Sequence, residues 1–130
     1  MPQVLIVDDD EDIRAVLRIA LEDAGYSVRD AADGDAAMNV LRQADTAMIV
    51  LVDYVMPRVD GVELLDATAS LPPDAPGHAY ILITASPQRI GPELAAQLAT
   101  RGVSVVPKPF DMSTILDAVA QASAQLVRVR

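Results

Sequence analysis

Short apolar runs rich in β-branched residues recur along the chain and alternate with segments of helical periodicity. The runs that predict strands are residues 4–7, 26–31, 47–52, 79–83 and 103–106. Three of them are apolar nearly throughout, as strands covered on both faces are. The clearest helix follows the first run, where one stripe holds Ile13, Val16, Leu17, Ala20, Leu21 and Ala24. Gly25 is placed to end it.

The same helical period returns in residues 33–44, 61–70, 92–101 and 112–126. Strands that alternate with helices predict an α/β fold of the (βα)5 type, a doubly wound five-stranded parallel sheet with helices on both faces. Functional groups are then expected at the carboxyl ends of the strands. The stretch SPQRIGP predicts an irregular entry to the fourth helix. In the proline-rich loop 71–79, we expect His78 to be solvated rather than bound to a metal.

Composition narrows the function classes. With 130 residues, 52% of them hydrophobic, the chain has material for one core, so we expect a single domain over residues 1–130. The net charge of −9 and the lack of a basic run argue against direct binding of nucleic acid. The chain has no cysteine, which removes disulfides and thiolate chemistry. It has no apolar run that could span a bilayer, so we expect a soluble, cytoplasmic protein without a membrane partner.

Polar residues stand directly after four of the five predicted strands: Asp8, Asp9, Asp53, Thr84 and Lys108. Each alone has an ordinary explanation. Asp9 or Asp10 suits a helix cap, and Asp53 suits a turn. Thr84 is a good strand residue, and a lysine is common on surfaces. These separate explanations do not predict that all of them gather at one end of one sheet.

Their chemistry explains the combination. Carboxylates that converge on one pocket raise each other's pKa unless a cation neutralises them. Mg²⁺ prefers such hard oxygen ligands and usually takes one or two carboxylates together with phosphate oxygens. A carboxylate can also act as a nucleophile and form an acyl phosphate, with a lysine and a hydroxyl around the phosphoryl charge.

Four stretches occur in order: VLIVDDDEDIR, LVDYVMPRVDG, ITAS and PKPF. With them the chain resembles a response-regulator receiver domain of two-component signalling, over residues 3 to about 125. The resemblance implies the flavodoxin-like strand order 2-1-3-4-5, which is taken from the family and not from the spacing of this sequence.

The resemblance also implies roles for individual residues. Asp53 would be the phosphoryl acceptor, and Asp8 and Asp9 would hold Mg²⁺ with Asp53. The backbone carbonyl of Val55 would complete the protein's share of the metal ligands.

Around the phosphoryl group, the resemblance implies Thr84, Ala85 and Lys108 as binding and switch residues. The peptide bond between Lys108 and Pro109 is expected to be cis. In many receivers an aromatic residue three positions before the lysine takes part in the switch, but this chain has Val105 there. Val55 is apolar where some fast-turnover receivers carry a polar side chain, which predicts slower loss of phosphate.

The leading hypothesis is a phosphoacceptor switch and not a turnover enzyme. A histidine kinase or histidine phosphotransfer protein would deliver the phosphoryl group in a Mg²⁺-dependent step. The group would alter a surface of the fourth helix, the fifth strand and the fifth helix, which a downstream protein or a second copy would read. The alternative is a small Mg²⁺-dependent phosphatase with an aspartyl nucleophile. Haloacid dehalogenase-like hydrolases of that kind carry DxDxT after the first strand, where this chain has DDDED. A binding module that is never phosphorylated is the third hypothesis.

Overall fold

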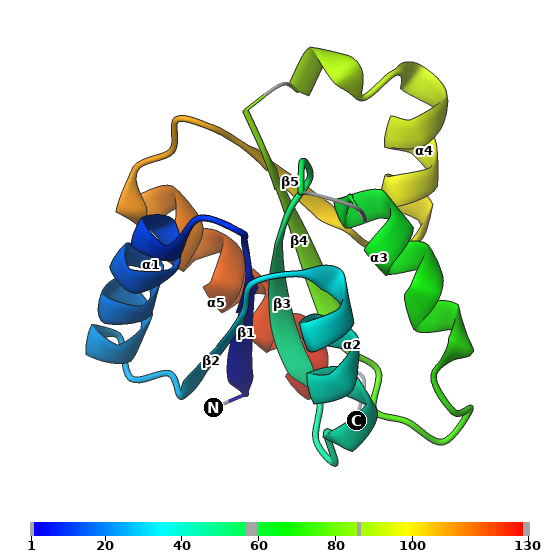
Figure 1. Ribbon diagram of the computed structural model, residues 1–130, viewed down its shortest axis with the longest axis horizontal. Helices are drawn as coiled ribbons and strands as arrows, with labels where there is room; N and C mark the ends of the chain where they lie inside the picture. The colour runs from blue at the N-terminus through cyan, green and yellow to red at the C-terminus, as the bar shows by residue number, and fades with distance from the viewer. Residues whose placement is uncertain (1, 57–59, 86, 129–130) are drawn as a thin grey trace.

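The chain forms a parallel five-stranded sheet with helices on both faces, as the computed structural model in Figure 1 shows. The structure describes residues 2–56, 60–85 and 87–128. Residues 57–59, within the second matching stretch, and Ser86, within ITAS and SPQRIGP, lie outside the described residues. The strands are β1 (Gln3–Val7), β2 (Val28–Ala31), β3 (Met48–Asp53), β4 (Ala79–Thr84) and β5 (Ser104–Pro107). Their order is β2-β1-β3-β4-β5, as the resemblance implied.

The helices lie where the hydrophobic period predicts them, with small differences at their ends. They are α1 (Glu11–Asp23), α2 (Gly34–Gln43), α3 (Gly61–Ala67), α4 (Pro92–Thr100) and α5 (Met112–Arg128). The third predicted helix is divided, because α3 continues as a 3₁₀ turn over Thr68–Ser70. Another 3₁₀ turn, Pro87–Arg89, precedes α4 and agrees with the irregular entry that the sequence predicts.

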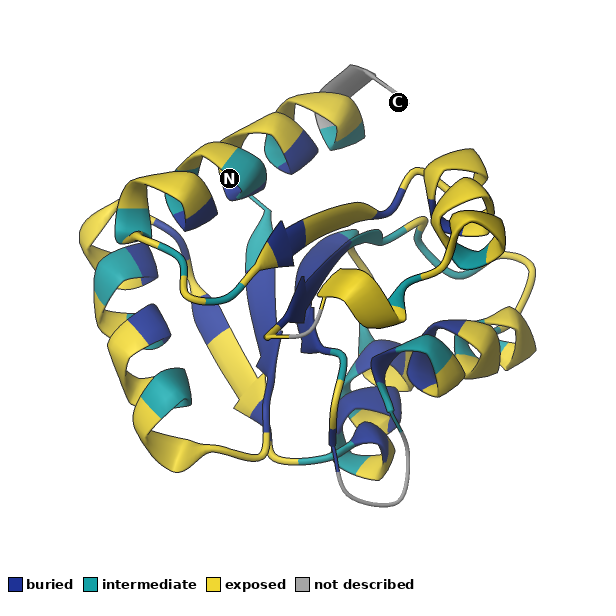
Figure 2. Cartoon of the chain, turned by 90° about the horizontal axis from the view of Figure 1, so that it is seen from above, coloured by how far each residue is buried: buried dark blue, intermediate teal, exposed yellow. Residues whose placement is uncertain are grey.

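Side-chain alternation along the strands builds one core on each face of the sheet. Val4 and Ile6 of β1 face the core beneath α1 and α5, whereas Leu5 and Val7 face the core beneath α2, α3 and α4. Figure 1 shows the two helix layers on opposite sides of the strands. Every residue of the central strand β3 is buried, while the edge strands β2 and β5 each expose two or more positions (Figure 2).

The strand register brings the ends of the strands into one row. Val7 of β1 pairs with Val52 of β3, so Asp8 comes beside Asp53. Asp53 pairs with Ile83, the residue before Thr84, and Thr84 pairs with Pro107, the residue before Lys108. The residues singled out after successive strands therefore lie along one edge of the sheet.

Two expectations about single residues are wrong. Val16 is 55% exposed, because α1 covers the sheet mainly through Leu17 and Leu21 and the predicted apolar stripe is wider than the area it covers. His78 is not a solvated loop residue but is partly buried, and its Nδ1 accepts a hydrogen bond from the backbone N–H of Met48 at 2.9 Å. Within the part of the chain that the structure describes, no helix has the length and apolar character needed to cross a bilayer.

Candidate metal and phosphoryl site

Three carboxylates converge at the carboxyl end of the sheet. Asp8 and Asp9 directly follow β1, and Asp53 is the last residue of β3. One carboxylate oxygen from each lies within 4.8 Å of the others, and Asp8 and Asp53 are buried while Asp9 is exposed. This cluster of hard oxygen donors with one side open to solvent has the chemistry that Mg²⁺ prefers.

Lys108 places its ammonium between the two buried acids. Its Nζ lies 3.5 Å from Oδ1 of Asp53 and 3.7 Å from Oδ2 of Asp8. The backbone holds the lysine in this place, because its N–H donates to the carbonyl oxygen of Thr84 at 2.7 Å. The peptide bond that follows, between Lys108 and Pro109, is cis.

The buried acids carry more charge than one lysine offsets. Burial raises the pKa of Asp8, and Lys108 and the backbone N–H of Asp10 oppose this shift only in part. Burial also raises the pKa of Asp53, and the charge of Asp8 raises it further. Both ionised forms therefore gain from a nearby divalent cation.

Local hydrogen bonds fix the position of Asp8. Asp10 caps α1, with its side chain accepting from the N–H groups of Asp12 and Ile13. The N–H of Asp10 donates to Oδ1 of Asp8 at 2.9 Å, and Nη1 of Arg14 donates to the Asp8 carbonyl oxygen at 2.6 Å. Of the two aspartates considered as caps, Asp10 takes that role, which leaves Asp9 available to the cluster.

Arg14 is not among the site residues that the sequence predicts. The available signal was its position one turn into the first helix, since long helical side chains point back towards the helix N-terminus. From there an arginine can reach the end of the preceding strand.

Gly61 allows α3 to begin against the end of β3. Its N–H donates to the carbonyl oxygen of Tyr54 at 2.8 Å. A Cβ at position 61 would lie 2.8 Å from the carbonyl oxygen of Asp53, closer than real Cβ contacts. Asp60 caps this helix in a reciprocal capping box with Glu63. The glycine is therefore required by the close approach of the two backbones.

The remaining residues noted in the sequence differ in how far they are exposed. Thr84 is fully buried at the end of β4, and Ala85 after it is exposed. Val55, two residues after Asp53, is 51% exposed, so its apolar side chain lies at the surface. Val105 on β5 is also partly exposed, at 38%.

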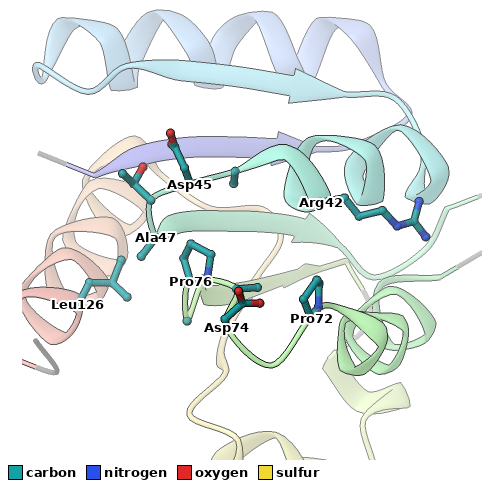
Figure 3. Close-up of a pocket in the computed structure, with 11 residues that line it drawn as sticks. Arg42, Asp45, Ala47, Pro72, Asp74, Pro76 and Leu126 are labelled. Atoms are coloured by element: carbon teal, nitrogen blue, oxygen red, sulfur yellow. The ribbon is translucent and has the colours of Figure 1, made fainter.

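A pocket of about 640 Å³ lies away from the acidic cluster, between the loop before β3, the loop before β4 and the end of α5 (Figure 3). Figure 3 shows Asp45 and Asp74 among the side chains that line it. These residues precede β3 and β4, whereas the acidic cluster follows the strands, so the pocket lies at the opposite end of the sheet. We assign the chemistry to the acidic cluster, because carboxylates and a lysine converge there.

Comparisons with known proteins agree with this geometry. The family described as the response regulator receiver domain matches residues 4–120. The chain belongs to this family. The response regulator MprA of Mycolicibacterium vanbaalenii is 34% identical over 114 residues, which are 88% of this chain and 47% of that protein. The chain thus spans about half the length of the curated relatives it matches.

Solved structures show the same fold. A CheY-like response regulator receiver domain protein from Methanospirillum hungatei has a TM-score of 0.83 at 23% identity, over 100% of this chain and 99% of that one. The response regulator TrrA of Thermotoga maritima, solved in complex with Mg²⁺–BeF, has a TM-score of 0.71 at 24% identity. The alignment with TrrA covers 94% of this chain and 99% of that one.

Proposed function

We propose that this chain is a phosphoacceptor switch in which Asp53 takes a phosphoryl group in a Mg²⁺-dependent step. The observation that carries the proposal is the convergence of Asp8, Asp9 and Asp53, with Nζ of Lys108 within 4.0 Å of the two buried carboxylates. The family membership defines a receiver domain and speaks against the phosphatase alternative. The sequence adds that the best-placed nucleophile follows the third strand and not the first.

The residues present fit a magnesium ion. Asp8, Asp9 and Asp53 would hold it together with the backbone carbonyl of Val55, and water would occupy the open side. When bound, the ion supplies positive charge against the oxygens of the incoming phosphoryl group. The neighbour TrrA, solved with Mg²⁺–BeF, supports this choice of ion by analogy.

Asp53 would act as the nucleophile. One of its carboxylate oxygens forms a bond to phosphorus while the P–N bond of a phosphohistidine breaks. The ring nitrogen keeps the bonding electron pair and leaves neutral, because the other ring nitrogen carries a proton. Lys108 is 3.5 Å from the accepting carboxylate and would pair with the transferred group. Thr84 and Ala85, next to it along the edge of the sheet, would bind the phosphoryl oxygens.

The donor would be a histidine kinase or a histidine phosphotransfer protein, since no residue at the site of this chain is a histidine. We propose that the chain assists its own phosphorylation and dephosphorylation but does not turn over a substrate. The phosphoryl group would alter the surface of α4, β5 and α5, which a downstream partner or a second copy would read.

Acetyl phosphate provides the test. The wild-type protein and an Asp53→Asn variant are incubated with acetyl phosphate, with and without Mg²⁺, and the added mass is located by mass spectrometry. We expect at most one phosphoryl group per chain, on Asp53, only with Mg²⁺ and only in the wild type. Uptake that ignores the metal, or that survives the substitution, would refute the assignment. Continuous hydrolysis of a generic phosphate ester would favour the phosphatase instead.

A further inference from the structure

Arg14 joins the end of β1 to the edge of the sheet. Its Nη1 donates to the carbonyl oxygen of Asp8 at 2.6 Å, and its Nε lies 3.8 Å from Oδ2 of Asp30, next to the end of β2. The Arg14 side chain is 16% exposed and Asp8 is buried, so the bond to the Asp8 carbonyl is largely shielded from water, whereas the Asp30 side chain is 40% exposed. A hydrogen bond from a guanidinium in such surroundings is stronger than one between neutral groups.

The bond from Arg14 is made where the strand pairing ends. Among the described residues, β1 pairs with β2 and β3 up to Val7. The N–H of Asp8 still donates to the carbonyl oxygen of Ala31 at 3.2 Å, and the Asp8 carbonyl accepts from Arg14. With Oδ1 taken by the N–H of Asp10, the backbone and one carboxylate oxygen of Asp8 are fixed by groups that are not metal ligands.

We propose that Arg14 is a positioning residue of the metal site. Its guanidinium holds the peptide bond between Asp8 and Asp9 in one orientation. Because this peptide joins the Cα atoms of the two residues, its orientation sets the directions of both carboxylates. The inference rests on the proposed function, since it assigns Arg14 a role towards the metal that those carboxylates would bind. Groups that orient metal ligands in this way typically change metal affinity by about 10- to 100-fold when they are removed.

Arg18 is a matched control on the same helix. Its Nη1 donates to the carbonyl oxygen of Val28 at 2.9 Å, and its Nη2 lies 3.5 Å from Oδ2 of Asp30. It therefore makes the same kinds of contact as Arg14, to the same acid, together with an exposed ion pair to Glu22 at 3.7 Å, but its backbone acceptor is in β2 and not at Asp8. A loss that follows only from weaker attachment of α1 to the sheet would appear in both variants.

The experiment measures Mg²⁺ binding directly. Isothermal titration calorimetry with MgCl₂, at constant pH and ionic strength, gives the Kd of the wild type and of the Arg14→Met, Arg14→Lys and Arg18→Met variants. The rate of phosphorylation by acetyl phosphate at saturating Mg²⁺ is measured beside it. Far-UV circular dichroism establishes that each variant is folded.

We expect Arg14→Met to weaken Mg²⁺ binding by about tenfold or more while the rate at saturating Mg²⁺ changes by less than about twofold. Arg14→Lys keeps the charge and one donor but lacks the planar fork, so it should weaken binding by about threefold. Arg18→Met should leave the Kd within about twofold of the wild type. If Arg14→Met does not fold, the comparison of Arg14→Lys with Arg18→Met decides the question.

An unchanged Kd in the folded Arg14 variants overturns the inference, and so does an equal loss in Arg18→Met. Neither result contradicts the proposed function, provided that the wild type binds Mg²⁺ and is phosphorylated on Asp53. A wild type that does not bind Mg²⁺ removes the proposed function and this inference with it.

Discussion

Replacement of Gly61 by alanine tests how tightly α3 is fitted against the end of β3, where Asp53 lies. The new Cβ would meet Cδ1 of Leu82 at 2.7 Å, the carbonyl oxygen of Asp53 at 2.8 Å and Cα of Tyr54 at 3.0 Å. Leu82 can turn its side chain away, but the other two contacts are backbone atoms. Ordinary contact begins at 3.4 Å, so α3 or the end of β3 must move by about half an ångström.

Added atoms in a well-packed place typically cost about 1–3 kcal/mol. Alanine's better helix propensity returns at most about 1 kcal/mol. Because two of the three contacts cannot rotate away, we expect Gly61→Ala to lower the free energy of unfolding by about 2 kcal/mol. With a urea m-value of about 2 kcal/mol per molar, the unfolding midpoint falls by about 1 M. Asp53 is the last residue of β3, so a movement of the end of this strand would displace its carboxylate. The phosphorylation rate should then fall by about tenfold.

Gly77→Ala is the matched control. A Cβ at position 77 meets nothing within 4 Å, so this variant should be as stable as the wild type or more stable by up to about 1 kcal/mol. Urea unfolding followed by circular dichroism measures all three proteins. An unfolding midpoint for Gly61→Ala equal to that of the wild type would show that the close contact between α3 and β3 is not a constraint.

Three further substitutions have expected outcomes. Burial lowers the pKa of His78, whose Nδ1 must stay unprotonated to accept from Met48, so its share of the stability should be lost as the pH falls from about 7 towards 5. The His78→Asn variant should lose less stability over that range in urea titrations, and equal slopes would exclude this role. Val55→Asn should speed the loss of phosphate from the phosphorylated protein, and an unchanged half-life in a label-release assay would argue against an effect of the apolar group. Asp53→Asn should raise the thermal midpoint without Mg²⁺, because burial and the charge of Asp8 raise the pKa of Asp53; a lower midpoint would contradict this. Mg²⁺ at about 100 times its Kd should stabilise the wild type by about 2.7 kcal/mol, and the variant by less.

The sequence was sufficient for the parts of the fold that depend on local patterns. The apolar runs and helical periods locate the strands and helices, because burial on one or two faces imposes those periods on the sequence. The convergence of Asp8, Asp9, Asp53 and Lys108 was also predicted from position, since the ends of parallel strands share one edge of the sheet. The strand order itself came from the family resemblance and not from the pattern.

The surroundings of three residues were not predicted from the sequence, and for two of them the cause is packing against distant segments. His78 accepts its hydrogen bond from Met48, which is 30 residues earlier, and no local sequence pattern indicates this contact. Val16 continues the apolar stripe of α1, but how much of a stripe is covered depends on the neighbouring elements. Arg14 was missed for a different reason: its acceptor is only six residues away but is a backbone carbonyl, and only the position of the arginine in the helix indicated the contact.

The attachment of α4 differs from that of the other helices. Of its described residues only Leu98 is buried, and the ion pair of Arg101 with Asp66 of α3 is largely exposed. One buried leucine contributes about 1.5–3 kcal/mol, and an exposed ion pair contributes about 0–1 kcal/mol. Leu94 adds a partly buried contact, so the whole attachment of α4 is worth only a few kcal/mol, which is comparable to two or three hydrogen bonds. We expect its amides to exchange with deuterium well before those of β3, whose residues are all buried.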